Sequence, residues 1–107
     1  MVNDCNCPEF TYEEMVQQVE DQRQPFIEQR YDDHRIRIFD PEAPAHLYKW
    51  HWDEDDRVVE PLNLNDWRFQ FDNELPIPFD KPVTIKAGQI HRVIPGNSPL
   101  NVKITAP

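Results

Sequence analysis

Proline content is the feature that most constrains how this chain can fold, because 11 prolines stand against only two glycines in 107 residues. Proline removes a backbone donor and fixes φ, so it favours strand starts, sheet edges and turns. Long helices fit this composition poorly, whereas short strands joined by rigid corners fit it well. We therefore expect a mostly β protein.

Alternation of apolar and polar residues locates the expected strands. Residues 34–39 alternate around Ile36 and Ile38, and residues 66–72 carry aromatic side chains on one face. Further strands are expected at residues 46–53, 57–62, 76–79, 82–86, 91–94 and 100–104. Several short strands with turn signals between them indicate a sandwich or a small barrel.

One segment, residues 12–23, predicts an α-helix. Thr11 at the N-cap and Glu14 three residues later form a capping box, and Pro25 marks the end of the helix. One face of this helix is apolar, with side chains at helical spacing: Tyr12, Met15, Val16 and Val19. We expect this face to pack on the β-domain or on a partner subunit.

Size and charge narrow the classes of function. A chain of 107 residues fits one domain, which we divide into an N-terminal segment, 1–33, and a barrel, 34–107. The net charge of −9 argues against a nucleic-acid binder, which needs a basic surface. The sequence holds no apolar run near the roughly 20 residues of a membrane span, and residues 1–10 do not resemble a signal peptide. We expect a cytoplasmic protein that binds neither nucleic acid nor membranes.

Three side chains form a candidate metal site. His51 and Asp53 are two residues apart, so on a strand they project from the same face. If the strand at 91–94 lies alongside, His91 adds a second imidazole. This set suits one divalent metal with open coordination positions, and it does not separate iron, manganese, nickel and zinc. A hydrogen-bonded network with Arg57 and no metal is the open alternative.

The segment that contains His91 resembles the second motif of the cupin superfamily, whose members are small barrels with a jelly-roll fold. That motif begins Pro-x-Gly-x-x-His. Lys86-Ala87-Gly88-Gln89-Ile90-His91 matches it at Gly88 and His91, with Lys86 in place of the proline. The resemblance implies that a tight bend at Gly88 precedes the strand that carries the histidine.

The segment around His51 resembles the first cupin motif, which has a His-x-His pair and a later glutamate. His51-Trp52-Asp53 carries aspartate where the second histidine would stand. Arg57 falls near the glutamate position, and Asp56 beside it is the candidate substitute. The resemblance therefore implies an altered metal site in which His51, Asp53 and His91 are the ligands.

A closer resemblance is to small cupin-like proteins of bacteriophage and bacterial genomes. It covers about residues 34–104 and rests on four segments: Trp50-His51-Trp52-Asp53, Asp56-Arg57, Gln70-Phe71-Asp72-Asn73-Glu74-Leu75-Pro76 and His91-Arg92. It implies a double-stranded β-helix barrel in a small binding or structural module. We hypothesise a phage-encoded or virion-associated protein, located in the host cytoplasm or in the virion.

Aromatic side chains alternate with the expected ligands in residues 46–53: Tyr48, Trp50 and Trp52. If the ligands face the lumen, these aromatics face outward. A large bare apolar patch is costly, so we expect a homo-oligomer or a larger protein assembly to cover them.

Two further polar side chains are candidate ligand-binding groups. Gln70 lies on the strand face opposite Trp67, Phe69 and Phe71, so we expect it to face the lumen and to bind a ligand or metal-bound water. Arg57 can neutralise a carboxylate or hold an anionic ligand through its guanidinium fork.

Three functions remain open at this point. The first is the binding or structural module. The second is a metal-dependent enzyme acting on a small polar substrate, such as a sugar isomerase or a dioxygenase. The third is a small-ligand sensor that uses the same lumen without catalysis. A fold resemblance does not choose among them.

Overall fold

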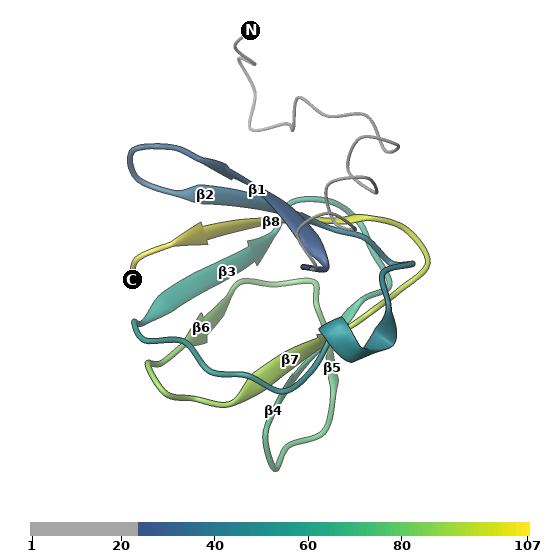
Figure 1. Cartoon of the computed structure of the whole chain (residues 1–107). Helices are drawn as coiled ribbons and strands as arrows, with labels where there is room; N and C mark the ends of the chain where they lie inside the picture. The colour runs from purple at the N-terminus through teal and green to yellow at the C-terminus, as the bar shows by residue number, and fades with distance from the viewer. Residues whose placement is uncertain (1–23) are drawn as a thin grey trace, which may run out of the picture.

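The computed structural model describes residues 24–107, which form antiparallel strands and a single short 3₁₀ helix (Figure 1). The strands in chain order are β1 Phe26–Arg30, β2 Arg35–Phe39, β3 Arg57–Pro61, β4 Arg68–Phe71, β5 Ile77–Pro78, β6 Val83–Ile85, β7 His91–Ile94 and β8 Leu100–Thr105. The 3₁₀ helix η1 spans Ala45–Leu47. The helix expected at 12–23 lies outside the described residues.

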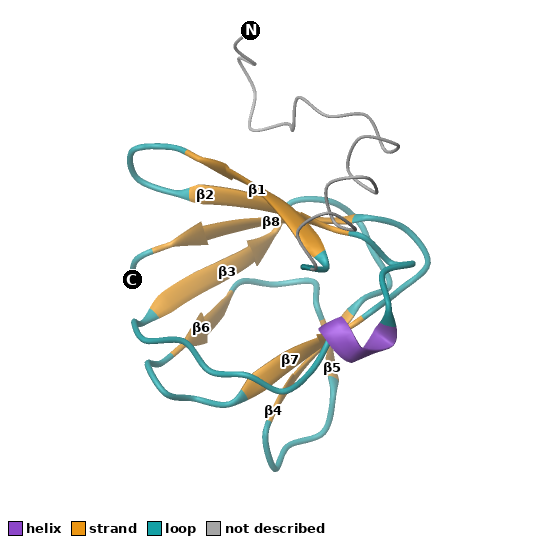
Figure 2. Ribbon diagram, viewed as in Figure 1, coloured by secondary structure: helices purple, strands orange, loops and turns teal. Residues whose placement is uncertain are grey.

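Two antiparallel sheets make up the domain. The larger sheet has the order β1-β2-β8-β3-β6, and the smaller has the order β5-β4-β7. Figure 2 shows the two sheets connected by long loops, with η1 beside them. This arrangement confirms the expectation of a mostly β, jelly-roll-like barrel. Among residues 24–107, no helix has the length and apolar character needed to cross a membrane.

The core lies between the inner faces of the two sheets. In β8, Leu100, Val102 and Ile104 are buried and alternate with partly exposed residues. Phe69 of β4 and the preceding Trp67 are both 1% exposed and belong to the same buried cluster. Period-two alternation in each sheet therefore encloses one apolar interior.

Strand β2 directs Arg37 and Phe39 into this interior. Arg37 lies directly opposite Val102 of β8, and Phe39 lies opposite Leu100. Directly opposed residues project from the same face of a sheet, so Arg37 and Phe39 share the inner face with β8. Ile38 points to the other face, where it packs with Ile27 in a separate cluster.

The sheet begins before the expected boundary at residue 34. β1 pairs with β2 along its full length, from Phe26 opposite Phe39 to Arg30 opposite Arg35. Pro25 disfavours a helical conformation at Gln24, and the chain continues as an extended strand. The described barrel therefore includes residues that the sequence division placed in the N-terminal segment.

The strand expected at 46–53 does not form. This part of the chain contains η1 and a single β-bridge between His51 and His91. Tyr48 follows η1 with φ −98° and ψ 57°, a conformation outside the strand region. The alternation of faces therefore does not run from Tyr48 through to Asp53.

Candidate functional site

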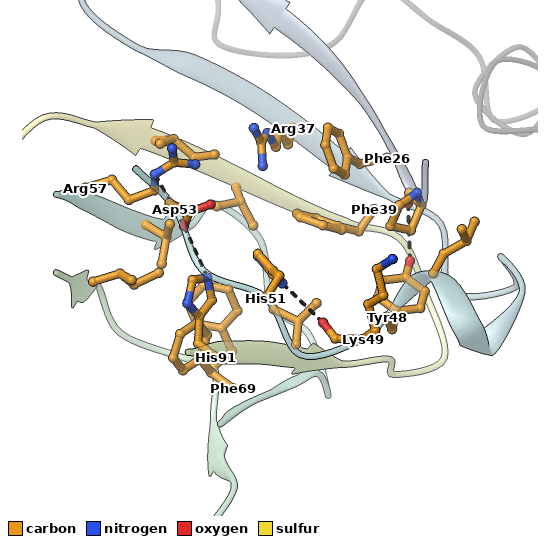
Figure 3. A pocket seen from close by; sticks show the side chains of 18 residues that line it. Phe26, Arg37, Phe39, Tyr48, Lys49, His51, Asp53, Arg57, Phe69 and His91 are labelled. Atoms are coloured by element: carbon orange, nitrogen blue, oxygen red, sulfur yellow. Dashed lines mark hydrogen bonds and ion pairs between the residues drawn. The ribbon is translucent and has the colours of Figure 1, made fainter. Parts of the chain in front are cut away.

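The two imidazoles and the carboxylate expected from the sequence lie together in the structure. One ligand atom each from His51, Asp53 and His91 falls within 4.8 Å of the other two. His91 is buried, Asp53 is partly buried and His51 is exposed. Figure 3 shows the three side chains among those that line the pocket, with a dashed line between Asp53 and His91. The structure confirms that these three residues lie close together. His51 does not belong to a full strand, however, because it takes part only in an isolated β-bridge.

Backbone hydrogen bonds hold the two ligand-bearing segments in place. The amide of His51 donates to the carbonyl of His91 at 3.1 Å, and the amide of His91 donates back at 2.9 Å. The amide of Gly88 donates to the carbonyl of Asp53 at 2.9 Å. Gly88 has a φ of 80°, which a residue with a side chain rarely adopts. The tight bend at Gly88 therefore fixes the backbone that carries Asp53.

Both histidines direct one ring nitrogen at a backbone carbonyl. Nδ1 of His91 lies 2.8 Å from the carbonyl of Gln89, and Nδ1 of His51 lies 3.2 Å from the carbonyl of Lys49. A carbonyl oxygen only accepts hydrogen bonds, so Nδ1 is the donor in each ring. In the neutral imidazole this leaves Nε2 with a lone pair, which is the arrangement typical of metal-ligating histidines.

Asp53 faces two positive or proton-bearing neighbours. Its Oδ2 is 3.3 Å from Nε2 of His91 and 3.6 Å from Nε of Arg57. Burial alone would raise the pKa of the Asp53 carboxyl, but the close contact with Nε2 of His91 and the charge of Arg57 together hold this pKa below its ordinary value. Asp53 is therefore a carboxylate near neutral pH, as a metal ligand must be.

Partial desolvation by the pocket walls lowers the pKa of His51, and the charges of His91 and Arg37 act in the same direction. The contact with Lys49 and the charge of Asp53 oppose this shift without reversing it. His51 is therefore neutral at physiological pH. A neutral imidazole is the form that binds a metal.

The site opens into a cavity of about 270 Å³ between the two sheets. Most of its wall is apolar and comes from the core side chains of both sheets, including Phe39, Phe69, Phe79, Ile85 and Val102. This volume is near the lower end of the roughly 300–1,000 Å³ of typical small-molecule sites. The pocket therefore fits a small organic ligand next to the three candidate metal ligands.

Three sequence expectations about the pocket are wrong or need correction. Gln70 does not line it: Gln70 accepts a hydrogen bond from Arg92 at 2.9 Å and donates to the carbonyl of Glu74 at 2.8 Å. The aromatic face of β4 is the one that fills the interior, so the opposite face, which carries Gln70, points away from the pocket.

Tyr48 is 9% exposed and lines the pocket, because the chain turns after η1. Asp56 also lies outside the pocket, where it accepts a hydrogen bond from the amide of Ala87 at 2.7 Å.

Arg57 and the two exposed tryptophans follow the sequence expectations. Arg57 lines the pocket, and its Nη2 forms an ion pair with Asp55 at 2.7 Å. Nε of Arg57 is buried without a hydrogen-bond partner in the described structure, close to Asp53. Trp50 and Trp52 are 39% and 59% exposed.

Sequence reasoning missed Arg37, which lines the pocket from β2. Its strand carries the alternating pattern Arg-Ile-Arg-Ile-Phe, and the isoleucines were the natural candidates for the inner face. Only the register against β8 shows that the arginine points inward. The sequence offered one weak signal, the presence of two arginines at alternate positions of an otherwise apolar strand.

Comparisons with known proteins support the fold. No protein-family model matches the sequence, and no curated protein matches it significantly. The structure is similar to that of a protein from Neisseria meningitidis, with a TM-score of 0.52 and 16% identity over 77% of this chain and 82% of that one. It is also similar to a cupin-2 domain-containing protein from Shewanella frigidimarina, with a TM-score of 0.51 and 14% identity over 82% of this chain and 90% of that one.

These similarities establish a cupin-like fold for the described residues. Identities of this size carry no information on substrate or reaction, because one fold hosts many functions.

Proposed function

We propose that this protein is a small cupin-like module that binds one divalent metal through His51, Asp53 and His91 and holds a small molecule in the adjoining pocket. The observation that carries the proposal is the orientation of the two imidazoles. Each directs Nδ1 at a backbone carbonyl, which leaves Nε2 available as a ligand. Such a carbonyl contact fixes both the tautomer and the ring orientation of a metal-binding histidine.

The contact between His91 and Asp53 supports a cation at this position. With the proton on Nδ1, a neutral His91 faces the Asp53 carboxylate with a lone pair, and the two atoms are 3.3 Å apart. Two acceptors at this distance repel unless a proton or a metal lies between them. The metal-free alternative is an imidazolium at His91 that donates to Asp53.

The donor set fits iron(II), manganese, nickel or zinc, which share a tolerance for mixed imidazole and carboxylate ligands. When bound, such a metal supplies Lewis acidity to a coordinated oxygen. The chain's own residues orient the ligands: Gly88 fixes the backbone of Asp53, and Arg57 balances the negative charge of its carboxylate. The rest of the pocket wall is mostly apolar.

Titration of the chelator-treated protein with Zn²⁺ and Mn²⁺ tests the proposal, with calorimetry as the readout. We expect one equivalent of metal to bind, and a His51→Ala/His91→Ala double variant to lose at least about 100-fold in affinity. His46→Ala is the matched control, because His46 is exposed and does not line the pocket. The proposal fails if wild-type protein binds neither metal, or if the double variant and the control bind equally.

A second candidate role is self-assembly through the exposed aromatic surface beside the bridge. In antiparallel register, Trp52 lies opposite Ile90 and Trp50 lies opposite Arg92, whose guanidinium stacks on Trp50 at 4.4 Å. Trp52 and Ile90 are 59% and 40% exposed. We propose a second copy of the chain as the cover for this surface. Sedimentation of wild type and Trp52→Ser tests it: a concentration-dependent dimer lost in the variant supports the role, and a wild-type monomer at all concentrations refutes it.

A further inference from the structure

The charged side chains that line the pocket are mostly cationic, although the protein as a whole is acidic. The full chain carries a net charge of −9. The charged groups in the pocket wall are three cations and one carboxylate: Arg37, Lys49, Arg57 and Asp53. An apolar cavity with this lining favours an anionic ligand over a neutral or cationic one, because a low-dielectric wall strengthens the attraction.

Of these cations, Arg37 is unusual because it is a charged residue of a strand that points into the apolar interior. Its neighbours on β2, Ile36 and Ile38, are buried on the opposite face, while Arg37 points inward beside Val102. A guanidinium in an apolar interior is costly unless it is paired. Glu28, directly opposite on β1, supplies that pairing.

The contacts of Arg37 leave part of its guanidinium free. Its Nε donates to Oε1 of Glu28 at 2.7 Å, and its carbon Cζ lies 4.2 Å from the ring centre of Phe26. Among the described residues, no hydrogen bond or ion pair involves either Nη nitrogen of Arg37. Glu28 and Phe26 therefore fix the plane of the guanidinium, and its Nη nitrogens remain for a ligand.

Arg37 faces the candidate metal site across the pocket. Figure 3 shows it on the wall opposite His91 and Phe69, with His51 between them. Arg57, by contrast, is already engaged by Asp53 and Asp55.

The space between these polar groups has aromatic and aliphatic walls. Phe26 and Phe39 contribute from the larger sheet, and Phe69 and Val93 from the smaller one. An apolar group of a ligand is stabilised here by about 25 cal/mol for each Å² removed from water. A ligand that suits the whole pocket thus combines one acidic head with a compact apolar body.

We propose that the pocket binds a small monocarboxylic acid with an apolar body, and that Arg37 is the side chain that recognises its carboxylate. The proposal deepens the function proposed above, because it assigns a ligand class to the same pocket. The planar fork of arginine matches the two oxygens of a carboxylate. The cavity of about 270 Å³ limits the ligand to a small molecule.

Calorimetric titration of the full chain with phenylacetate, hexanoate and neutral phenylacetamide tests the assignment. The titration is run on chelator-treated protein and repeated with one equivalent of Zn²⁺. We expect phenylacetate to bind at least about tenfold more tightly than phenylacetamide in both conditions, because a charge-assisted pair is lost with the amide. Hexanoate is expected to bind like phenylacetate, since the wall selects for apolar bulk.

Substitution of Arg37 assigns the effect to this side chain. Arg37→Gln should remove the tenfold preference for the acid, and Arg37→Lys should retain part of it. Arg68→Gln on β4 is the matched control, because Arg68 is exposed and does not line the pocket. This control should keep the wild-type preference.

The outcomes separate this inference from the proposed metal site. Equal binding of phenylacetate and phenylacetamide by wild type overturns the inference even if Zn²⁺ binds, and this comparison holds even if the Arg37 variants do not fold. The inference is also overturned if neither acid binds at millimolar concentration, or if a folded Arg37→Gln variant keeps the preference. A selective response to the acids without Zn²⁺ binding supports the inference and rejects the metal site.

Discussion

The two segments that form the site differ in how they are held. His91 stands at the start of β7, pairs with Phe71 of β4 and is 4% exposed. His51 stands in a segment that contacts the sheet through a single bridge, and it is exposed. A regular strand positions one ligand, whereas the other depends on a few specific contacts of an irregular segment.

Tyr48 is the main anchor of the irregular segment. Its ring packs edge-on against Trp67 at 5.6 Å within the core. Its hydroxyl donates to the carbonyl of Asp40 and lies 3.2 Å from the carbonyl of Pro25. Burial raises the pKa of this phenol well above its ordinary value, so it stays protonated and remains a donor. The strand that carries His91 is held by its pairing with β4, whereas Tyr48 in the core anchors the irregular segment that carries His51.

The largest expected difference between the two segments is in stability. In metal-free protein, His91→Ala should lower the free energy of unfolding by about 2 kcal/mol, since it leaves a cavity and removes a partly buried hydrogen bond and a stacked contact with Phe69. His51→Ala should cost less than about 0.5 kcal/mol, because the residue is exposed. Urea denaturation of both variants measures the difference. Equal losses would show that the two segments are held alike.

A smaller loss of stability is expected when the hydroxyl of Tyr48, the anchor of the irregular segment, is removed. Tyr48→Phe keeps the ring and removes the hydroxyl, so the carbonyl of Asp40 loses a donor. We expect a loss of about 1 kcal/mol in the free energy of unfolding, measured by urea denaturation. Tyr31→Phe is the control, because the Tyr31 hydroxyl donates to Gln29 at an exposed site and its removal should be near neutral. A neutral Tyr48→Phe would mean that packing alone holds the segment.

The smallest effect is expected from Asp53, which joins the two segments. Its pKa in the folded protein lies below the ordinary 3.8, so the ionised form favours folding. This contribution is present above that ordinary value and is lost as the pH falls through the folded pKa. Asp53→Asn should therefore show a flatter dependence of stability on pH below about pH 4 than metal-free wild type. Urea denaturation between pH 7 and pH 2 tests this, and parallel curves would show that Asp53 makes no such contribution.

The local pattern of the sequence predicted much of the fold. Seven strands were expected before residue 40 or after residue 56 from alternation, turn residues and prolines. Five of these seven overlap strands of at least four residues: those at 34–39, 57–62, 66–72, 91–94 and 100–104. The short segments at 76–79 and 82–86 also contain strands, β5 and β6. Alternation failed at 46–53, because η1 and the turn at Tyr48 change the direction of the chain there.

The candidate site was predicted in part. The spacing of His51 and Asp53 and the Gly88–His91 motif placed the three ligands together, and the structure confirms that proximity. The supporting groups were predicted less well, because which face of a strand points inward is a property of the packed sheets. Gln70 therefore points away from the pocket, and Arg37 points into it.

By itself, the sequence determined the chemistry of the side chains and the local geometry that proline, glycine and alternation impose. It determined a β-rich chain with two imidazoles and a carboxylate close to one another. Only the packed sheets show that Tyr48 anchors the ligand segment in the core and that Arg37 lines the same pocket as His51. The physical reason is that alternation fixes which residues share a face, but only the pairing of β2 with β8 decides which face of β2 lines the pocket.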